Sequence, residues 1–311
     1  MKINRRDFLK KGTALTAGLI VAPSLIKAAP VTYPIRLGGP VPGNFTDPVT
    51  WVRAVKNLGY SAVYCPLQPG ASSEMIRSFR EEAKINNLII AEVGAWSNTL
   101  DPDETARKNA IQKNIEALQL ADEIGAICCV NISGARGKIW DGPYPENYAE
   151  ETFGLIVDTV RKIIDAVKPS SAFYTLEPMP YMLPDSPRSC LDLVKAIERK
   201  QCGVHLDPVN MISSPQIYFN NGRFLRECFS ILGPHIKSIH AKDILLVPEL
   251  TVHLEERRPG TGGLDYPVFL QEASRLKDVP FMLEHLNSQE DYRLAAEFVR
   301  DAGKKAGIPF M

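Results

Sequence analysis

The 311-residue sequence lacks an excess of charge of either sign, because 36 Lys and Arg residues balance 36 Asp and Glu residues. Such a balance provides no overall field that would attract nucleic acid or an anionic membrane, which argues against a non-specific DNA-binding protein. The first expected strand is not followed by a GxGxxG motif, which counts against an open, doubly wound nucleotide-binding sheet.

Cysteines are few and follow no recognisable framework. The six of them include no CxxC motif and show no spacing typical of a set of disulfides. Cys65, Cys128 and Cys129 lie within apolar, strand-like runs. We therefore expect buried free thiols rather than disulfide bonds.

The apolar run near the N-terminus is short for a membrane span. It covers residues 13–26 and follows the charged segment MKINRRDFLKKG, with no Cys after it to serve as a lipoprotein site. Arg5-Arg6 followed by DFLK resembles a bacterial twin-arginine export signal. This resemblance predicts a signal at residues 1–29, export of the folded protein to the periplasm by the twin-arginine translocation machinery, and a signal that is cleaved between Pro23 and Val31 or retained as an anchor. An ordinary basic helix or membrane anchor is the alternative.

Apolar strand-like runs alternate with helix-like segments along the rest of the chain. In the segment 148–168, apolar residues recur at steps of three and four, as on one face of a helix. Another helix is expected over 102–125, with Asp101 and Glu104 as its capping box. Eight strands that are each followed by a helix predict a single-domain α/β protein over residues 30–311, a (β/α)8 TIM barrel, with an open sheet as the alternative. The expected strands are 34–40, 60–66, 88–95, 126–133, 172–179, 202–208, 236–243 and 279–286. Two long loops, 134–147 and 245–264, are expected to act as lids or substrate loops.

Polar residues gather at the ends of the last four expected strands, where barrel enzymes carry their chemistry. Glu177, Asp207 and Glu284 each follow a Leu and precede a loop, so they are expected at a similar height and facing a common centre. Three converging carboxylates repel one another unless a divalent cation neutralises them. Together with His240 they would suit one Mn²⁺, Mg²⁺ or Co²⁺ ion and would tolerate Zn²⁺. Taken singly, each carboxylate could instead cap a loop, and His240 could be a buried histidine whose hydrogen bonds are made within the core.

Two further residues share the inward face of these strands. Lys242 lies two residues after His240 and is expected to contact or protonate a substrate oxygen, or else to be a rim ammonium paired with Asp243. His205 is expected to point to the same face of its strand as Asp207, but it lies about 6.6 Å deeper along that strand. We expect His205 to contact the substrate or to support a ligand rather than to bind the metal.

The motifs TLEP, HLDPVN, SIHAKD, RPGTGGLDY and MLEHL resemble the xylose isomerase-like TIM-barrel superfamily of sugar phosphate isomerases and epimerases. The resemblance extends over essentially the whole chain after the export segment. It implies that Glu177, Asp207, His240 and Glu284 bind one divalent metal. It also implies that Glu177 and Glu284 exchange the proton at the reacting carbon, one on each face of the sugar, as in the ketose 3-epimerase members. The metal would chelate a carbonyl and its neighbouring hydroxyl and stabilise the enediolate.

The chain departs from the epimerase pattern at two positions that contact the substrate in the family. Asn210 stands where epimerases often have a His, and Lys242 and Asp243 stand where they tend to have an Arg. The particular sugar is therefore not implied. Further candidates for substrate contact are Arg258, which precedes the glycine-rich PGTGG segment, Trp96, which could form a stacking wall or simply pack, and Asn131.

These observations predict a metal-dependent isomerase or epimerase. Its expected partners are a small carbohydrate substrate and, during export, the twin-arginine translocation machinery. No nucleic acid is expected, and a homo-oligomer is possible. Phosphorylated sugars are scarce in the periplasm, so the expected substrate is a free sugar, a keto-sugar or a keto-glycoside. A dehydratase or lyase that eliminates a group from the same enediolate is the main alternative, and a non-catalytic sugar-binding protein is another. The related three-zinc endonucleases are disfavoured, because the chain has five His residues and no basic groove.

Overall fold

The computed structural model describes residues 31–311 of the chain. The predicted export signal at 1–29 lies outside the described residues. Thr32–Met311 form one compact unit, as the single-domain prediction requires. Within residues 31–311, no helix is both long enough and apolar enough to cross a bilayer.

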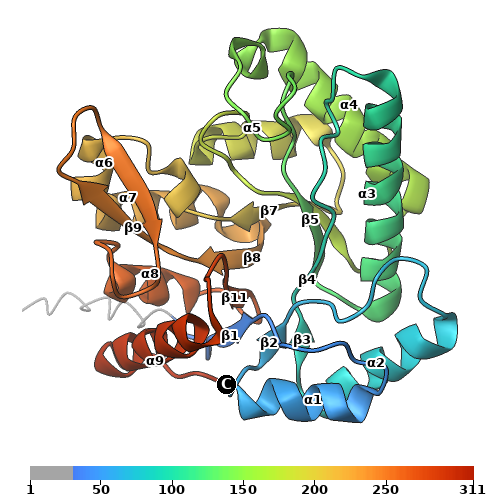
Figure 1. Ribbon diagram of the computed structural model, residues 1–311, viewed down its shortest axis with the longest axis vertical. Helices are drawn as coiled ribbons and strands as arrows, with labels where there is room; N and C mark the ends of the chain where they lie inside the picture. The colour runs from blue at the N-terminus through green and yellow to red at the C-terminus, as the bar shows by residue number, and fades with distance from the viewer. Residues whose placement is uncertain (1–30) are drawn as a thin grey trace, which may run out of the picture. The chain divides into compact units, whose positions relative to one another are not determined.

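A parallel sheet closes on itself at the centre of this unit (Figure 1). Its strands run in the order β3-β2-β1-β11-β8-β7-β6-β5-β4. Because β3 pairs with β2 and β4 pairs with β5, the two short strands act as successive halves of the single strand expected at 88–95. The sheet is thus an eight-stranded TIM barrel, which confirms the predicted fold. The strands are β1 Arg36–Gly39, β2 Ala62–Val63, β3 Ile89–Ile90, β4 Glu92–Gly94, β5 Cys128–Asn131, β6 Phe173–Leu176, β7 Cys202–Leu206, β8 Ile236–Ala241 and β11 Pro280–Leu283.

Helices connect the strands and cover the outside of the barrel. The helices predicted over 102–125 and 148–168 are confirmed as α3 and α4. The capping box predicted at Asp101 is wrong, because α3 begins two residues later. Asp103 caps the helix by accepting from the Ala106 N–H at 2.7 Å. Asp101 instead accepts from the Asp103 N–H. The helices are α1 Pro48–Asn57, α2 Ser73–Ile85, α3 Glu104–Ile124, α4 Glu150–Val167, α5 Pro187–Ile197, α6 Pro215–Phe219, α7 Asn221–Leu232, α8 Tyr266–Ala273 and α9 Gln289–Lys305.

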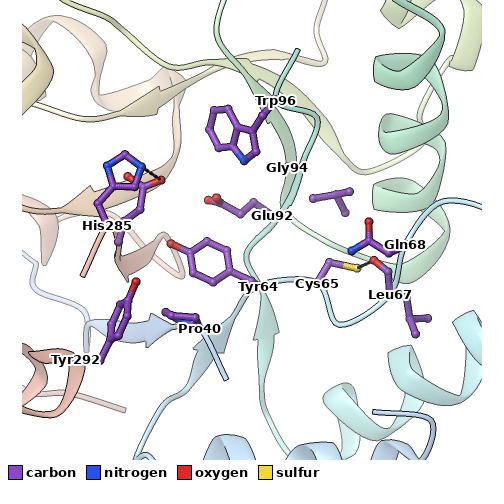
Figure 2. Close-up of a pocket in the computed structure, with 12 residues that line it drawn as sticks. Pro40, Tyr64, Cys65, Leu67, Gln68, Glu92, Gly94, Trp96, His285 and Tyr292 are labelled. Carbon is purple, nitrogen blue, oxygen red and sulfur yellow. Dashed lines mark hydrogen bonds and ion pairs between the residues drawn. The ribbon is translucent and has the colours of Figure 1, made fainter. Parts of the chain in front are cut away.

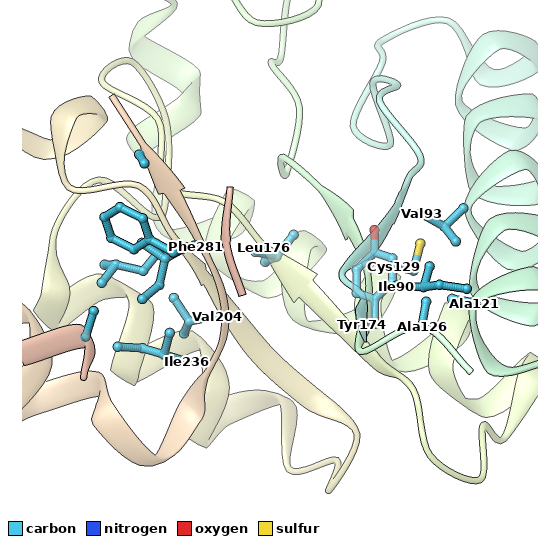
Figure 3. Close-up of a cluster of buried hydrophobic side chains, with 14 of the residues drawn as sticks. Ile90, Val93, Ala121, Ala126, Cys129, Tyr174, Leu176, Val204, Ile236 and Phe281 are labelled. Carbon is cyan, nitrogen blue, oxygen red and sulfur yellow. The ribbon is translucent and has the colours of Figure 1, made fainter. Parts of the chain in front are cut away.

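The main hydrophobic core lies between the barrel and its helices (Figure 3). Cys129 of β5, for example, faces Ala121 of α3 in this layer. All six cysteines are free and five of them are buried, which confirms the expected free thiols. Inside the barrel, Met282 packs with Ala62 and Ala91. Gly38 makes room for Met282, because a Cβ at that position would lie 2.6 Å from the methionine sulfur.

The segment expected to be a loop at 245–264 instead contains an antiparallel hairpin. Strand β9, Asp243–Val247, pairs with β10, His253–Arg257. Its register places Glu256 opposite Ile244, so the second strand returns toward the carboxyl end of β8. The other predicted loop, 134–147, runs into a short 3-10 helix at Pro145–Tyr148.

Asp243 anchors the glycine-rich segment that follows this hairpin. Its carboxylate accepts from the backbone N–H groups of Gly260 and Gly262 at 3.0 Å and from that of Leu264 at 2.9 Å. It also accepts from the Ile244 N–H at 2.8 Å. The alternative in which Lys242 is a rim ammonium paired with Asp243 is therefore wrong, because both carboxylate oxygens of Asp243 accept from backbone N–H groups. Gly262 must lack a side chain, since a Cβ there would meet Asp243 Oδ1 at 2.4 Å.

Replacing Asp243 by Asn should loosen this loop. An amide group would turn an N–H toward backbone donors that the carboxylate now satisfies, and we expect a loss of about 2–3 kcal/mol in the free energy of unfolding. Urea unfolding measures the change. Asp158, exposed on α4, provides the matched control, and Asp158→Asn should change the stability by less than about 0.5 kcal/mol. Equal losses in the two variants would contradict the anchoring role.

Candidate active site

The four predicted metal ligands meet at the carboxyl end of the barrel. Glu177, Asp207 and Glu284 are the first residues after β6, β7 and β11, and His240 lies within β8. Parallel strands end at the same edge of a barrel, so three residues at equivalent strand ends reach one centre. One donor atom from each of the four side chains lies within 4.8 Å of every other.

His240 stands at the middle of this cluster. Its Nδ1 lies 2.9 Å from Glu284 Oε2, 3.3 Å from Glu177 Oε1 and 4.0 Å from Asp207 Oδ2. His240 and Asp207 are fully buried, Glu177 is 3% exposed, and the side chain of Glu284 is 15% exposed. The partial exposure of Glu284 marks the side from which solvent or a substrate reaches the cluster.

The pKa values of Glu177, Glu284 and His240 are shifted in different directions. Burial raises the pKa of Glu177 to about 7, against the opposing charge of His240. Burial alone would also raise the pKa of Glu284, but the charges of His240 and Lys242 outweigh it and lower that pKa. For His240, burial would lower the pKa, whereas the carboxylates of Glu284 and Glu177 raise it well above its usual value. The cluster is thus rich in negative charge that the protein balances only partly.

The donor set fits a divalent cation. Asp207 Oδ2 and Glu284 Oε2 are buried and form no hydrogen bond of acceptable geometry among the described residues, although the Lys242 ammonium lies 2.9 Å from each of them. Both belong to the four-residue cluster, and buried polar atoms without partners are rare in folded proteins. Three carboxylates and one imidazole are a typical donor set for Mn²⁺, Mg²⁺ or Co²⁺. Glu177, Asp207, His240 and Glu284 could therefore hold one such ion.

The turn after β7 fixes the orientation of two carboxylates. Asp207 Oδ1 accepts from the backbone N–H groups of Val209 at 2.9 Å and Asn210 at 3.3 Å, which leaves Oδ2 to face the centre. Asn210 Nδ2 donates to Glu177 Oε1 at 3.0 Å and to the carbonyl of Pro178 at 3.1 Å. Asn210, predicted to contact the substrate, thus ties two of the candidate ligands together and also lines the cavity above them.

A second layer of buried polar residues lies behind His240. Glu92, 2% exposed, approaches His240 Nε2 at 3.4 Å and His205 Nδ1 at 3.4 Å, and accepts from Ser238 Oγ at 3.0 Å. His205 is fully buried with its ring 3.9 Å from that of His240, and burial lowers its pKa to about 3. His205 therefore lies beside His240, behind the walls of both cavities, and its nitrogens form no hydrogen bond among the described residues.

Sequence reasoning did not identify Glu92 as a site residue. The available signal was a single carboxylate within the apolar run LIIAEVGA. A carboxylate in such a position is costly unless it has buried partners. Its partners here are His205, Ser238 and His240, none of which is close to it in the sequence.

Lys242 lies inside the cluster rather than at the barrel rim. Its side chain is 2% exposed, and its Nζ lies 2.9 Å from both Asp207 Oδ2 and Glu284 Oε2. Burial would lower the pKa of Lys242, but Asp207, Glu284 and further carboxylates raise it well above its usual value. Glu256, on strand β10, approaches the same ammonium at 3.2 Å, and its Oε1 lies 3.3 Å from His285 Nδ1. Glu256 was missed because the hairpin that returns it to the site was expected to be a loop.

Two of the remaining predicted contact residues do not reach the centre. Asn131 is fully buried and uses its amide on the backbone of Ser97, accepting from the N–H at 3.1 Å and donating to the carbonyl at 3.0 Å. Arg258 lies 3.6 Å from Asp291 Oδ1 and does not line either of the cavities that Glu284 lines at the mouth of the barrel. The predicted glycine-rich substrate loop is instead the segment that Asp243 anchors.

Two of the cavities at the mouth of the barrel are lined by Glu284. The first, here named the reaction cavity, has a volume of about 330 Å³ and is lined in part by Glu177, Asn210 and Lys242. The second, named the side cavity, has a volume of about 320 Å³ and lies over the ends of β1, β2 and β4 (Figure 2). Trp96, predicted as a stacking wall, lines both cavities.

Solved structures with the same fold include sugar epimerases. The 3-keto-D-glucoside 4-epimerase from E. coli is 13% identical with a TM-score of 0.64, covering 86% of this chain and 99% of that one. D-Psicose 3-epimerase from Clostridium cellulolyticum H10, solved with D-tagatose, is 16% identical with a TM-score of 0.63, covering 88% and 100%. A Mycobacterium smegmatis protein in complex with magnesium is 16% identical with a TM-score of 0.61, covering 88% and 98%. At these identities the similarity establishes the fold.

A search of curated protein sequences found no match. A family model described as xylose isomerase-like TIM barrel matches residues 52–302. The match includes every strand of the barrel except β1, together with all four residues of the cluster around His240. The protein belongs to the xylose isomerase-like TIM barrel family.

Proposed function

We propose that the protein is a divalent-metal-dependent isomerase or epimerase of a free sugar, a keto-sugar or a keto-glycoside. The observation that carries the proposal is the convergence of Glu177, Asp207, Glu284 and His240 on one centre that opens into a cavity. An ion bound there would polarise a substrate carbonyl and its neighbouring hydroxyl. The sugar epimerases among the structures with the same fold support this substrate class.

In this proposal Glu177 and Glu284 move the proton. They approach His240 Nδ1 from β6 and β11, strands that lie on opposite sides of β8 in the barrel. In the proposed reaction one carboxylate takes the proton from the carbon next to the carbonyl. The other glutamic acid returns a proton to the opposite face, and exchange with water resets the pair. Both side chains line the reaction cavity.

Lys242 favours a second candidate reaction. Its ammonium lies 2.9 Å from Glu284 Oε2 and lines the same cavity. A buried cationic acid beside a base is also suited to protonating a departing oxygen. If the group on the next carbon leaves after deprotonation, the same site performs a dehydratase or lyase reaction, with water or a sugar as the leaving group.

The location of the enzyme is part of the proposal. The segment 1–29 resembles a twin-arginine signal, and the machinery that reads such signals would deliver the folded protein to the periplasm. Binding of the metal would then precede export. An exported enzyme would meet unphosphorylated sugars, which agrees with a reaction cavity whose cation, Lys242, is already surrounded by carboxylates.

Metal binding should stabilise the protein. Mn²⁺ added to chelator-treated protein at about 100 times its Kd should contribute about 2.7 kcal/mol and raise the Tm by several degrees. Asp207→Asn should abolish this shift, because it removes a ligand oxygen. Glu92→Gln should weaken binding by about 10- to 100-fold, because it removes a partner that orients His240. Asp158→Asn should behave as wild type. An unchanged Mn²⁺ titration of Asp207→Asn would refute the assigned centre.

Replacing either proposed proton carrier should remove turnover. Glu177→Gln and Glu284→Gln should each lower kcat by about 10²- to 10⁴-fold, because an amide cannot accept the proton. NMR detects the reaction as deuterium incorporation from D₂O into D-fructose or a 3-keto-glucoside. Glu249→Gln, at the exposed end of the hairpin, is the control and should retain full activity.

The same experiment separates the competing functions. Formation of an epimer with deuterium at the reacting carbon supports the proposal. Loss of water or of the aglycone identifies the lyase, and binding of the sugar without any exchange identifies a non-catalytic binding protein. Full turnover in both Gln variants would exclude Glu177 and Glu284 as the proton carriers.

A further inference from the structure

The reaction cavity and the side cavity share one wall. Trp96, Glu284 and His285 line both of them, whereas Glu177 and Lys242 line only the reaction cavity. Each cavity, at about 320–330 Å³, is at the lower end of the ~300–1,000 Å³ range of small-molecule sites. Each therefore has room for one small ring, and the shared wall places their contents side by side.

The side cavity has the lining of a sugar site. Figure 2 shows Tyr64, Trp96 and Tyr292 around it, with the Glu92 carboxylate pointing into the space between Tyr64 and Trp96. Aromatic faces pack well against the C–H faces of a pyranose ring, and ligand sites typically combine such walls with a few polar groups.

Two polar groups of the side cavity, Tyr292 and Gln68, are free to bind a ligand, whereas the Glu92 carboxylate already faces Ser238, His205 and His240. The Tyr292 hydroxyl accepts from the Leu286 N–H at 3.3 Å, which leaves its own hydrogen to donate. The side-chain amide of Gln68 is exposed and makes no hydrogen bond with another residue of the range 31–311. The cavity thus offers both donors and acceptors, which an aglycone with hydroxyl groups would use.

The wall between the cavities is fixed in position. The Trp96 carbonyl accepts from Lys113 Nζ at 2.9 Å, and Asn131 holds the backbone of Ser97 at both its N–H and its carbonyl. Gly94 lets the indole lie close to β4, since a Cβ at that position would be 2.5 Å from Trp96 Nε1. Asn131, predicted as a substrate contact, therefore acts on this wall through the adjacent backbone.

We infer that the cleft binds a two-ring glycoside, with the reacting keto-sugar in the reaction cavity and a second sugar ring in the side cavity. The inference rests on the proposed function for the reacting ring and narrows the class of substrate to a disaccharide or other glycoside with a second sugar ring, rather than a single sugar or a simple alkyl glycoside. Trp96, Gln68 and Tyr292 are the specificity-determining residues of the second position.

Matched substrates with and without the second ring test this inference. Methyl 3-keto-α-D-glucoside is compared with 3-keto-trehalose, and D-fructose with isomaltulose, which carries a glucose on its terminal hydroxyl. For the pair that is turned over, kcat/KM of the metal-loaded enzyme should be at least about tenfold higher for the two-ring member, equivalent to about 1.4 kcal/mol. Most of the difference should appear in KM.

Filling the side cavity should remove this preference. In Gln68→Trp, the ratio of the two kcat/KM values should fall about tenfold, toward one, through a rise in KM for the two-ring member. Gln112→Trp, on the outer surface of α3, should keep the wild-type ratio. Equal kcat/KM values within each pair for the wild-type enzyme, or equal losses for both members in Gln68→Trp, would overturn the inference.

A binding measurement separates this inference from the proposed reaction. In saturation-transfer NMR, the second ring of 3-keto-trehalose or isomaltulose should receive magnetisation from wild-type protein and lose it in Gln68→Trp. Contact of the second ring without turnover would support the two-ring cleft and refute the proposed catalysis. Turnover without contact of the second ring would refute the two-ring cleft and leave the proposed function standing.

Discussion

The burial of three carboxylates around His240 is the constraint on which the rest of the site depends. The barrel brings Glu177, Asp207 and Glu284 together because parallel strands end at one edge. Burial then makes their charges costly. The surroundings offset that cost in several ways: backbone N–H groups at Asp207, the Asn210 amide at Glu177, and the Lys242 ammonium between Asp207 and Glu284. Asp207 Oδ2 and Glu284 Oε2 lie close to Lys242 but form no hydrogen bond of acceptable geometry among the described residues, and a divalent cation would suit this centre.

At the junction of β8 and β9, adjacent residues point to opposite sides of the strand and therefore have different roles. His240 and Lys242 project into the barrel mouth, while Asp243, one residue on, projects to the other side and holds Gly260, Gly262 and Leu264. The loop anchored by Asp243 begins directly after β10, the strand that carries Glu256 to Lys242. One short segment therefore both supplies charge to the site and fixes the loop beside it.

The fold and the centre of the site were predictable because they follow local periodicity. Apolar runs with a carboxylate at the carboxyl end identify Glu177, Asp207 and Glu284 from the sequence alone. Glu256 was not predictable, since its position depends on a hairpin register that has no clear signal in the segment 245–264. Arg258 was predicted to contact the substrate because it precedes a glycine-rich motif. The backbone N–H groups of those glycines instead donate to Asp243. Contacts between distant segments decided each of these outcomes.

The shared wall of the two cavities links substrate choice to the proposed chemistry. Glu284 is the first residue after β11, and His285 adopts a left-handed conformation with φ of 55°, so the chain turns sharply at the point where both side chains line both cavities. Glu284 is also the most exposed member of the four-residue cluster around His240, at 15%. A ring that fills the side cavity would cover this exposed side and keep water away from the carboxylate. Water exclusion strengthens electrostatic interactions at a reacting centre, so occupation of the side cavity would favour the chemistry as well as the binding.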